Sequence, residues 1–245
     1  MEVKAEKINP YDNSRAKSEQ VKEMFDSIAP AYDFMNRAMT FGIDKWWRAK
    51  AVKMIKAHTP HKILDVATGT GDLAIKLARS LKPDKITGID LSEGMIEIGK
   101  RKVDEANLNN IISLATGDCL ALPFDNNTFD CITVAYGVRN FEHLDKGYQE
   151  MYRVLNEGGM LCVIELSTPT SPIIKPLYNC YSHYIIPFVG RLISKDVRAY
   201  SYLPESIAAV PQGDDMLQLM RNAGFKKCKF KRLTFGTCTI YTAFK

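Results

Sequence analysis

The sequence predicts a doubly wound α/β domain, in which helices cover both faces of a mostly parallel sheet. From Lys62 onward, short apolar segments alternate with helix-length segments, an order typical of parallel strands joined by crossover helices. The first apolar segment runs into a glycine-rich turn, and aspartates stand at or just past the ends of the next two. These features place polar groups at the carboxyl edge of the sheet, where such domains bind ligands.

The expected elements follow from these alternations. The expected strands are 62–66, 85–90, 111–116, 130–136 and 160–166, and the expected helices between them are 71–80, 94–105 and 146–156. Another helix is expected from Asp214 to Asn222, before two last strands at 225–233 and 237–244. The short TFGT connection between these strands predicts an antiparallel hairpin. We therefore expect a seven-stranded sheet with an antiparallel C-terminal strand.

Residues 1–245 are expected to form a single domain, because this length and 46% apolar residues suffice for one core. Residues 1–60 are expected to form a helical N-terminal extension. Its first 17 residues are polar and include Pro10, which predicts a loose arm, and Ser18 is the expected helix cap. Residues 44–48 open a second helix. Residues 168–204, rich in proline and tyrosine, predict an insertion that forms a lid over the acceptor site.

Composition excludes several classes of protein. No run of roughly 20 apolar residues is present, and the N-terminus lacks the apolar segment of a secretory signal, which indicates a cytoplasmic protein. The six cysteines form no CxxC or Cys/His cluster, so we expect no metal site and no disulfide framework. The net charge is +5, and residues 191–245 hold ten Lys+Arg against four Asp+Glu. This basic end could contact an anionic surface.

The segment KILDVATGTGDL, residues 62–73, carries the first ligand-binding signal. Gly69 and Gly71 remove side chains where a ligand must approach the backbone. Asp90 ends the next strand about 20 residues later, where a ribose diol is commonly bound in such folds. Leu91, which follows it, is included in the same predicted site. Together these residues predict an adenosine-containing ligand.

The GTGDLA spacing also fits a dinucleotide fingerprint, so a nicotinamide or flavin enzyme is the alternative. A pyrophosphate at the helix N-terminus would meet Asp72 and Asp65 without a basic partner, whereas the sulfonium and ammonium groups of S-adenosylmethionine suit these carboxylates. Asp65 either contacts the methionine part or orders the turn. Asp118 and Cys119 follow the third strand, where a carboxylate could accept a hydrogen bond from adenine and the Cys119 backbone could contact the ring edge.

The ordered motifs LDVATGTGDL, GIDLS, GDCLALPF and FDCITVAYGVRNF resemble the Rossmann-like class I S-adenosylmethionine-dependent methyltransferases. A closer resemblance is to the menaquinone and ubiquinone biosynthesis C-methyltransferases, through YDFMNRAMTFGIDKWW at 32–47, GVRN at 137–140 and RVLNEGGMLCVIELS at 153–167. With the cofactor motifs, this resemblance covers nearly the whole chain. The chain departs from the family pattern at Thr40 and Asp44, where serine and histidine are usual, and at Asn156 and Glu157.

The resemblance implies that S-adenosylmethionine is the cofactor and that Thr68, Asp90, Asp118 and Cys119 fall on cofactor-binding positions. It also implies that a reduced polyprenyl quinone accepts the methyl group on a ring carbon. We favour demethylmenaquinol over the methoxybenzoquinol of the ubiquinone pathway, partly because Ala135 stands where some ubiquinone-pathway members have serine.

Three residues at or just after the end of the fourth strand are the catalytic candidates. Arg139 and Asn140 are expected to stabilise and orient the quinol oxyanion, and Tyr136 is expected to pack beside the ring. Without the resemblance, Arg139 would be interpreted as a surface residue paired with Glu142 or Asp145.

The lipid acceptor predicts transient contact with a membrane surface, with the protein peripheral at the inner face of the membrane; a homodimer is left open. Lysines and arginine at 226–232 form either a solvated strand face or a binding patch. Two other functions compete: an RNA methyltransferase, suggested by the basic charge, and a cofactor-binding scaffold without catalysis. We expect no nucleic-acid partner, because no RNA module and no Asn-Pro-Pro-Tyr signature is visible.

Overall fold

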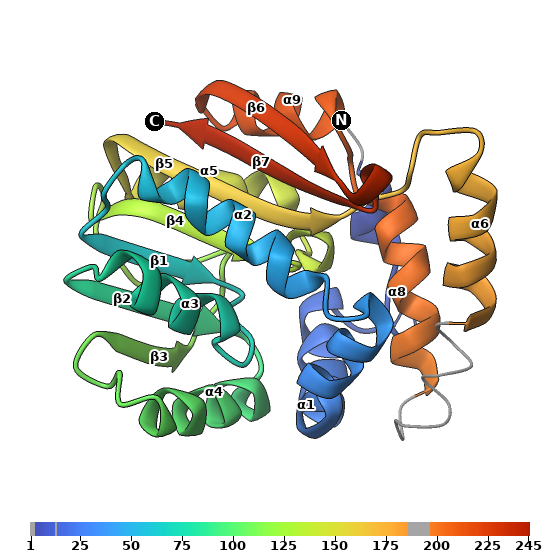
Figure 1. The fold of residues 1–245 in the computed structure, drawn as a ribbon, viewed down its shortest axis with the longest axis horizontal. Coiled ribbons are helices and arrows are strands. Elements are labelled where there is room, and N and C mark those ends of the chain that lie inside the picture. Colours follow the sequence, from blue (N-terminus) through green and yellow to red (C-terminus); the bar gives the residue numbers. More distant parts are fainter. Residues whose placement is uncertain (1–2, 13, 186–196) are drawn as a thin grey trace.

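The computed structural model describes residues 3–12, 14–185 and 197–245, and its strands form one sheet. The strands are β1 (Lys62–Val66), β2 (Lys85–Asp90), β3 (Ile112–Thr116), β4 (Phe129–Ala135), β5 (Leu155–Leu166), β6 (Lys226–Leu233) and β7 (Cys238–Phe244). Their order is β3-β2-β1-β4-β5-β7-β6 (Figure 1). Neighbours among β1 to β5 pair in parallel, and β7 is antiparallel to both β5 and β6. The predicted seven-stranded sheet and C-terminal hairpin are confirmed.

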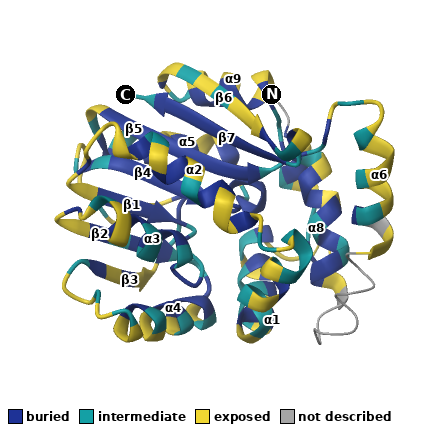
Figure 2. Cartoon of the chain, viewed as in Figure 1, coloured by how far each residue is buried: buried dark blue, intermediate teal, exposed yellow. Residues whose placement is uncertain are grey.

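Helices cover both faces of this sheet. The helices are α1 (Lys17–Thr40), α2 (Asp44–Lys56), α3 (Asp72–Leu81), α4 (Glu93–Glu105), α5 (Leu144–Val154), α6 (Ile174–Cys180), α8 (Val197–Ala209) and α9 (Asp214–Asn222). Figure 1 shows α2 and α3 on one face and α5 and α9 on the other. Leu77 of α3 and Tyr148 of α5 are fully buried in two separate cores, and Figure 2 shows the buried sheet between them. The doubly wound fold is therefore confirmed.

Two predicted helix boundaries are wrong. Ala16 is the N-cap of α1, so Ser18 lies inside the helix and does not cap it. The backbone N–H groups of Lys17 and Ser18 donate instead to the Glu142 carboxylate, at 3.3 and 3.4 Å. The helix expected at 146–156 ends at Val154, because Leu155 already pairs with Phe129 as the first residue of β5.

The expected loose N-terminal arm is packed against the domain. Val3 and Ala5 are buried, and residues 4–7 form a short 3-10 helix. The Glu6 carboxylate accepts a hydrogen bond from the Leu144 N–H at 2.8 Å, at the start of α5. The Lys17 ammonium donates to the Ala5 carbonyl at 2.6 Å. A polar composition predicts an unpacked arm, but two small apolar side chains and two polar anchors suffice to hold it.

The helices α1, α6 and α8 lie beyond the carboxyl ends of the parallel strands (Figure 1). The predicted 168–204 insertion contributes α6, a π-helical turn at Tyr181–Ile185 and the first residues of α8, while its residues 186–196 lie outside the described part of the chain. Within that described part, no helix combines the length and apolar character needed to cross a bilayer. The chain reverses its direction of travel through the sheet between β1 and β4, which is where such folds form their binding crevice.

Candidate functional site

The turn after β1 is held in shape by left-handed backbone and by Asp90. Gly69 and Gly71 have φ of 56° and 76°, conformations that favour glycine. The Asp90 carboxylate accepts hydrogen bonds from the N–H of Gly69 at 2.8 Å and from the N–H of Ser92 at 3.0 Å. Asp90 therefore fastens the β1 turn to the end of β2. Burial raises the pKa of Asp90, and these hydrogen bonds oppose that shift.

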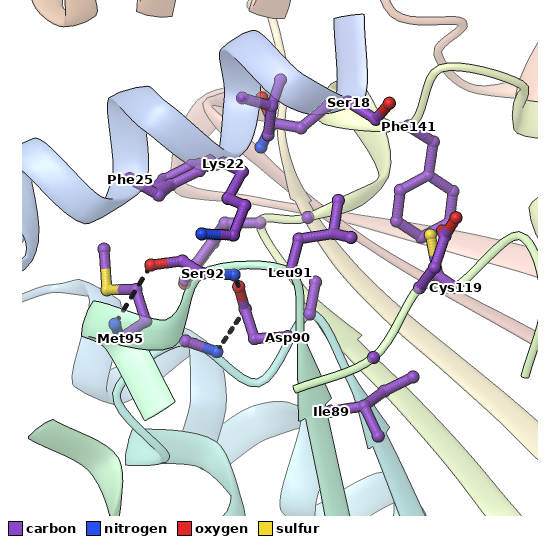
Figure 3. Close-up of a pocket in the computed structure, with 18 of the residues that line it drawn as sticks. Ser18, Lys22, Phe25, Ile89, Asp90, Leu91, Ser92, Met95, Cys119 and Phe141 are labelled. Atoms are coloured by element: carbon purple, nitrogen blue, oxygen red, sulfur yellow. Dashed lines mark hydrogen bonds between the residues drawn. The ribbon is translucent and has the colours of Figure 1, made fainter. Parts of the chain in front are cut away.

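A first cavity of about 730 Å³ lies between α1 and the carboxyl ends of β1, β2 and β4. Five of the predicted cofactor-binding residues line it, namely Gly69, Asp90, Leu91, Asp118 and Cys119. Its lining also includes Ile89, Phe141 and Ala135. Figure 3 shows Asp90 and Leu91 facing Lys22 and Phe25, which reach over the cavity from α1.

The structure places Asp65, Thr68 and Gly71 outside the lining of this cavity. The Asp65 carboxylate is buried and accepts hydrogen bonds from the Thr68 hydroxyl at 2.7 Å and the Thr133 hydroxyl at 2.5 Å. Burial raises the pKa of Asp65 to about 6, despite these two hydrogen bonds. This geometry favours the alternative in which Asp65 orders the turn. Gly71 is the N-cap of α3.

The expectation that Asp72 lacks a basic partner is wrong. The Lys102 ammonium lies 2.5 Å from the Asp72 carboxylate and 2.6 Å from that of Asp33. Although burial opposes it, Lys102 lowers the pKa of Asp72. The charge at the α3 N-terminus is thus balanced by a lysine distant in sequence, and it does not by itself exclude a pyrophosphate.

The charged side chains that line the first cavity distinguish S-adenosylmethionine from a ligand with a pyrophosphate. They include the carboxylates of Asp90, Asp118 and Glu142 and, among the described residues, a single cation, Lys22. A pyrophosphate would meet net negative charge here, whereas a ligand with sulfonium and ammonium groups would be stabilised. The cavity residues therefore fit S-adenosylmethionine. In the described part of the chain, no group of histidine, cysteine and carboxylate side chains is suited to hold a metal ion.

Helix α1 closes the first cavity and is a part of the site that the sequence motifs missed. The Asp26 carboxylate accepts hydrogen bonds from the Ser92 hydroxyl at 2.6 Å and from the Gly94 N–H at 2.9 Å. These bonds fasten α1 to the first turn of α4, and they place Lys22 and Phe25 over Asp90 (Figure 3). Nothing local in the sequence distinguishes Asp26 from other polar residues of an amphipathic helix.

A second cavity of about 980 Å³ adjoins the first, and Tyr32 and Tyr136 line both. Its walls are mainly aromatic and aliphatic and come from α1, α2, the end of β5, the segment from α6 to α8 and the hairpin turn. They include Met39, Phe41, Ile43, Trp47, Leu166, Tyr178, Tyr181, Leu203 and Ile207. Apolar walls with a few polar groups are typical of a pocket for an apolar ligand.

The three catalytic candidates gather at the carboxyl end of β4, between the cavities. Tyr136 has a φ of 62° and a buried side chain. Arg139 lines the second cavity, and its Nη1 lies 2.7 Å from the Glu165 carboxylate. Asn140 lines the first cavity and accepts a hydrogen bond from the Tyr202 hydroxyl at 3.2 Å. The interpretation of Arg139 as a surface residue is wrong, because its partner is the buried Glu165.

Two charged residues of the second cavity were not predicted from the sequence as site residues. Asp44 and Arg48, one turn apart on α2, form a buried ion pair, and both line this cavity. The Arg48 guanidinium lies 5.2 Å from the centre of the Tyr136 ring. The 32–47 motif contains Asp44, but an Asp at i and an Arg at i+4 of a helix is ordinarily a surface pair.

Solved structures of methyltransferases share this fold. A SAM-dependent methyltransferase from Thermotoga maritima is 18% identical, with a TM-score of 0.62 over 91% of this chain and 99% of that chain. The [4+2]-cyclase SpnF is also 18% identical, with a TM-score of 0.67 over 93% and 96%. At this identity the likeness concerns the fold. Fold, cavity and sequence comparisons together define the class: the protein is a Rossmann-like S-adenosylmethionine-dependent methyltransferase.

The sequence comparisons then identify the family. The ubiE/COQ5 methyltransferase family matches residues 13–245. The demethylmenaquinone methyltransferase of Bacteroides fragilis is 51% identical over 245 residues, all of both chains, and that of Porphyromonas gingivalis is 48% identical over 98% of each. The ubiquinone/menaquinone biosynthesis C-methyltransferase UbiE of Geotalea daltonii is 45% identical over 94% of this chain and 97% of that protein. The chain belongs to the ubiE/COQ5 methyltransferase family, which confirms the resemblance drawn from its motifs.

Proposed function

We propose that the protein methylates a ring carbon of demethylmenaquinol to give menaquinol. The observation that carries this proposal is the apolar second cavity, which adjoins the first cavity at Tyr136 and contains the buried cation of Arg139. A flat aromatic acceptor with an ionisable hydroxyl suits such a cavity. The names of the Bacteroides fragilis and Porphyromonas gingivalis relatives support the naphthoquinol over other head groups.

The first cavity would hold S-adenosylmethionine. Asp90 would accept hydrogen bonds from the ribose hydroxyls, and Asp118 and Cys119 would contact the adenine. Gly69 and Leu91 would lie against the ligand, while Thr68, Gly71 and Asp65 shape the turn. Bound S-adenosylmethionine supplies an electrophilic methyl group, and the electron pair of the broken carbon–sulfur bond stays on sulfur.

The protein must turn the quinol ring into a carbon nucleophile. A phenolic hydroxyl has a pKa near about 10, so it must lose its proton for electron density to reach the ring carbon. The Arg139 guanidinium, held by Glu165, would stabilise the resulting oxyanion. Asn140 would orient the ring and Tyr136 would pack beside it. After the new carbon–carbon bond forms, the ring carbon loses its proton and the ring oxygen regains one, so the net release is one proton per methyl group transferred.

Exposed apolar side chains surround the second cavity and support contact with a membrane surface. Phe41 is 81% exposed, Leu177 is 67% exposed and Phe235 is 76% exposed. Phe41 itself lines the cavity, Leu177 precedes the lining residue Tyr178, and Phe235 lies between the lining residues Thr234 and Thr237. A polyprenyl tail too long for the cavity would leave it across this apolar rim. We propose that Phe41, Leu177 and Phe235 rest transiently on the bilayer that holds the substrate.

Methyl transfer from labelled S-adenosylmethionine tests the proposal directly. The acceptors are chemically reduced demethylmenaquinone, a reduced methoxybenzoquinone and bulk RNA, with mass spectrometry of the products. We expect label on the naphthoquinol ring carbon. Label only on the benzoquinol would reassign the head group to the ubiquinone pathway. Label only on RNA, or cofactor binding without any product, would overturn the quinol proposal in favour of an RNA methyltransferase or a scaffold.

A further inference from the structure

Three residues that line the second cavity carry buried hydrogen-bond donors without partners. Among the described residues, the Nε of Arg48, the Nε of Arg139 and the hydroxyl of Tyr136 are buried without a hydrogen-bond partner. All three residues line the second cavity. Buried donors are nearly always paired, because an unpaired one loses its hydration and gains nothing in return. Three such donors on residues that line one cavity are the starting point for a ligand with oxygen acceptors.

The two arginines lie at different parts of Tyr136, one at its backbone and the other at its ring. The Arg139 Nη1 donates to the Tyr136 backbone carbonyl, at one end of that residue. The Arg48 guanidinium lies over the side-chain ring of Tyr136, 5.2 Å from the centre of that ring. The guanidinium groups thus contact different parts of the same residue. They offer two separate places for an acceptor oxygen.

Each arginine is held by its own buried carboxylate. Arg48 pairs with Asp44, whose side chain is 3% exposed, and Arg139 pairs with Glu165, whose side chain is 2% exposed. The Thr40 hydroxyl lies 3.0 Å from the other Asp44 oxygen and fixes that carboxylate further. A buried ion pair is weak evidence for stability, since removing two charges from water offsets their attraction. Two such pairs, whose arginines line one apolar cavity, are better explained by a ligand that needs two cationic donors.

We propose that Arg48, held by Asp44, forms with Tyr136 a second oxygen-binding subsite, so that the cavity binds both oxygens of a 1,4-dihydroxy aromatic ring. One oxygen would bind at Arg139 and the other at Arg48 and the Tyr136 hydroxyl. This inference rests on the proposed quinol substrate and adds how its ring is recognised. Arginine stays protonated, so the subsite donates hydrogen bonds and transfers no proton. Its effect is to favour the quinol over molecules with a single ring oxygen.

Binding of two ring compounds tests this subsite without any turnover. The affinities of 1,4-naphthalenediol and of 1-naphthol, which lacks one oxygen, are measured anaerobically in the presence of S-adenosylhomocysteine. We expect the wild-type protein to prefer the diol by about tenfold or more, because the second oxygen finds charged donors. Equal affinities in the wild-type protein would overturn the inference.

Variants then assign the preference to Arg48. Replacing Arg48 alone would leave Asp44 buried and unpaired, so the main variant combines Arg48→Met with Asp44→Leu, which removes the pair as a unit. It should bind diol and naphthol equally while keeping cofactor affinity. Arg48→Lys keeps the charge but loses Nε, and Tyr136→Phe keeps the ring but loses the hydroxyl, so each should lose part of the preference. Arg79→Met, at an exposed arginine of α3, is the matched control and should keep it.

The outcomes separate this inference from the proposed function. If the wild-type protein methylates demethylmenaquinol and the double variant keeps the full diol preference, the second subsite is wrong and the proposed function stands. If the wild-type protein methylates no quinol yet shows a diol preference that depends on Arg48, the subsite stands and the proposed acceptor is wrong.

Discussion

The Glu165 carboxylate holds Arg139 by both its side chain and its backbone. One oxygen lies 2.7 Å from Arg139 Nη1, and the other accepts a hydrogen bond from the Arg139 N–H at 3.3 Å. Glu165 belongs to β5 and Arg139 follows β4, so neighbouring parallel strands bring them together at the carboxyl edge of the sheet. The Lys17 ammonium also donates to the Arg139 carbonyl at 3.2 Å. The cation is therefore positioned before any substrate binds.

Arg139→Ala is expected to reduce turnover by about 10²- to 10³-fold, the usual effect of losing an oxyanion donor. Cofactor affinity should stay nearly unchanged, because Arg139 lies outside the lining of the first cavity. Glu165 would be left buried without its cation, which should also lower the free energy of unfolding by roughly 3–5 kcal/mol. Steady-state kinetics, cofactor titration and urea unfolding measure the three quantities. A loss of cofactor affinity with normal turnover per bound cofactor would show that the assigned role is wrong.

Asp90→Ala is expected to raise the Kd for S-adenosylmethionine by about tenfold or more. The change removes the acceptor of the Gly69 and Ser92 N–H groups as well as the proposed ribose contact, and a hydrogen bond to a charged group contributes about 1.5–3 kcal/mol. Isothermal titration calorimetry measures the affinity. Asp84→Ala, at an exposed aspartate before β2, is the control and should bind normally. Unchanged affinity in the Asp90 variant would remove Asp90 from the cofactor site.

Asp26→Ala is expected to loosen α1 over the first cavity. The Asp26 carboxylate bonds to the Ser92 hydroxyl and the Gly94 N–H, so its loss leaves the cover of the cavity without this anchor. We expect faster cofactor release, by up to about 30-fold if each of the two bonds contributes about 1 kcal/mol. Stopped-flow displacement measures the rate, with Glu23→Ala on the exposed side of α1 as the control. Equal release rates in both variants would show that α1 does not limit release.

Replacing Leu177 and Phe235 together with serine is expected to weaken binding to lipid vesicles. Both side chains are largely exposed, so the change should leave folding intact while removing apolar area from the proposed membrane contact. Activity on a long-chain quinol in vesicles should fall, while activity on a short-chain quinol in solution should not. Vesicle flotation and parallel assays provide the measurements. Undiminished flotation would show that this rim is not the membrane contact.

The raised pKa of Asp65 predicts a specific dependence of stability on pH. Burial raises the folded-state pKa to about 6, above the unfolded value of about 3.9. Between these values the folded chain binds more protons, so stability falls as pH rises from about 4 to about 6 and is level above that range. Asp65→Asn should lack this decline, a difference of up to about 3 kcal/mol. Urea unfolding of both proteins at about pH 4 and about pH 7 measures it; parallel curves would show that the pKa is not raised.

The sequence alone determined the sheet and the part of the site that the carboxyl ends of its parallel strands contribute. Strands and helices alternate visibly, and in a parallel sheet the carboxyl ends of the strands meet at one edge, so Gly69, Asp90 and Asp118 could be placed together from their positions alone. All three line the first cavity. Arg139 and Tyr136 could be placed near them for the same reason, because both follow β4. The cofactor class and the family followed from motifs of this local kind.

Only the tertiary structure decided what these residues contact. Glu165 as the partner of Arg139, Asp26 as the anchor of α1, and Arg48 beside Tyr136 each join segments that are distant in the chain. Such contacts depend on how helices pack over the sheet edge, and local residue patterns do not encode them. Arg48 lies beside the Tyr136 ring because α2 packs its Asp44–Arg48 pair against the first residue after β4, a relationship that no local motif expresses.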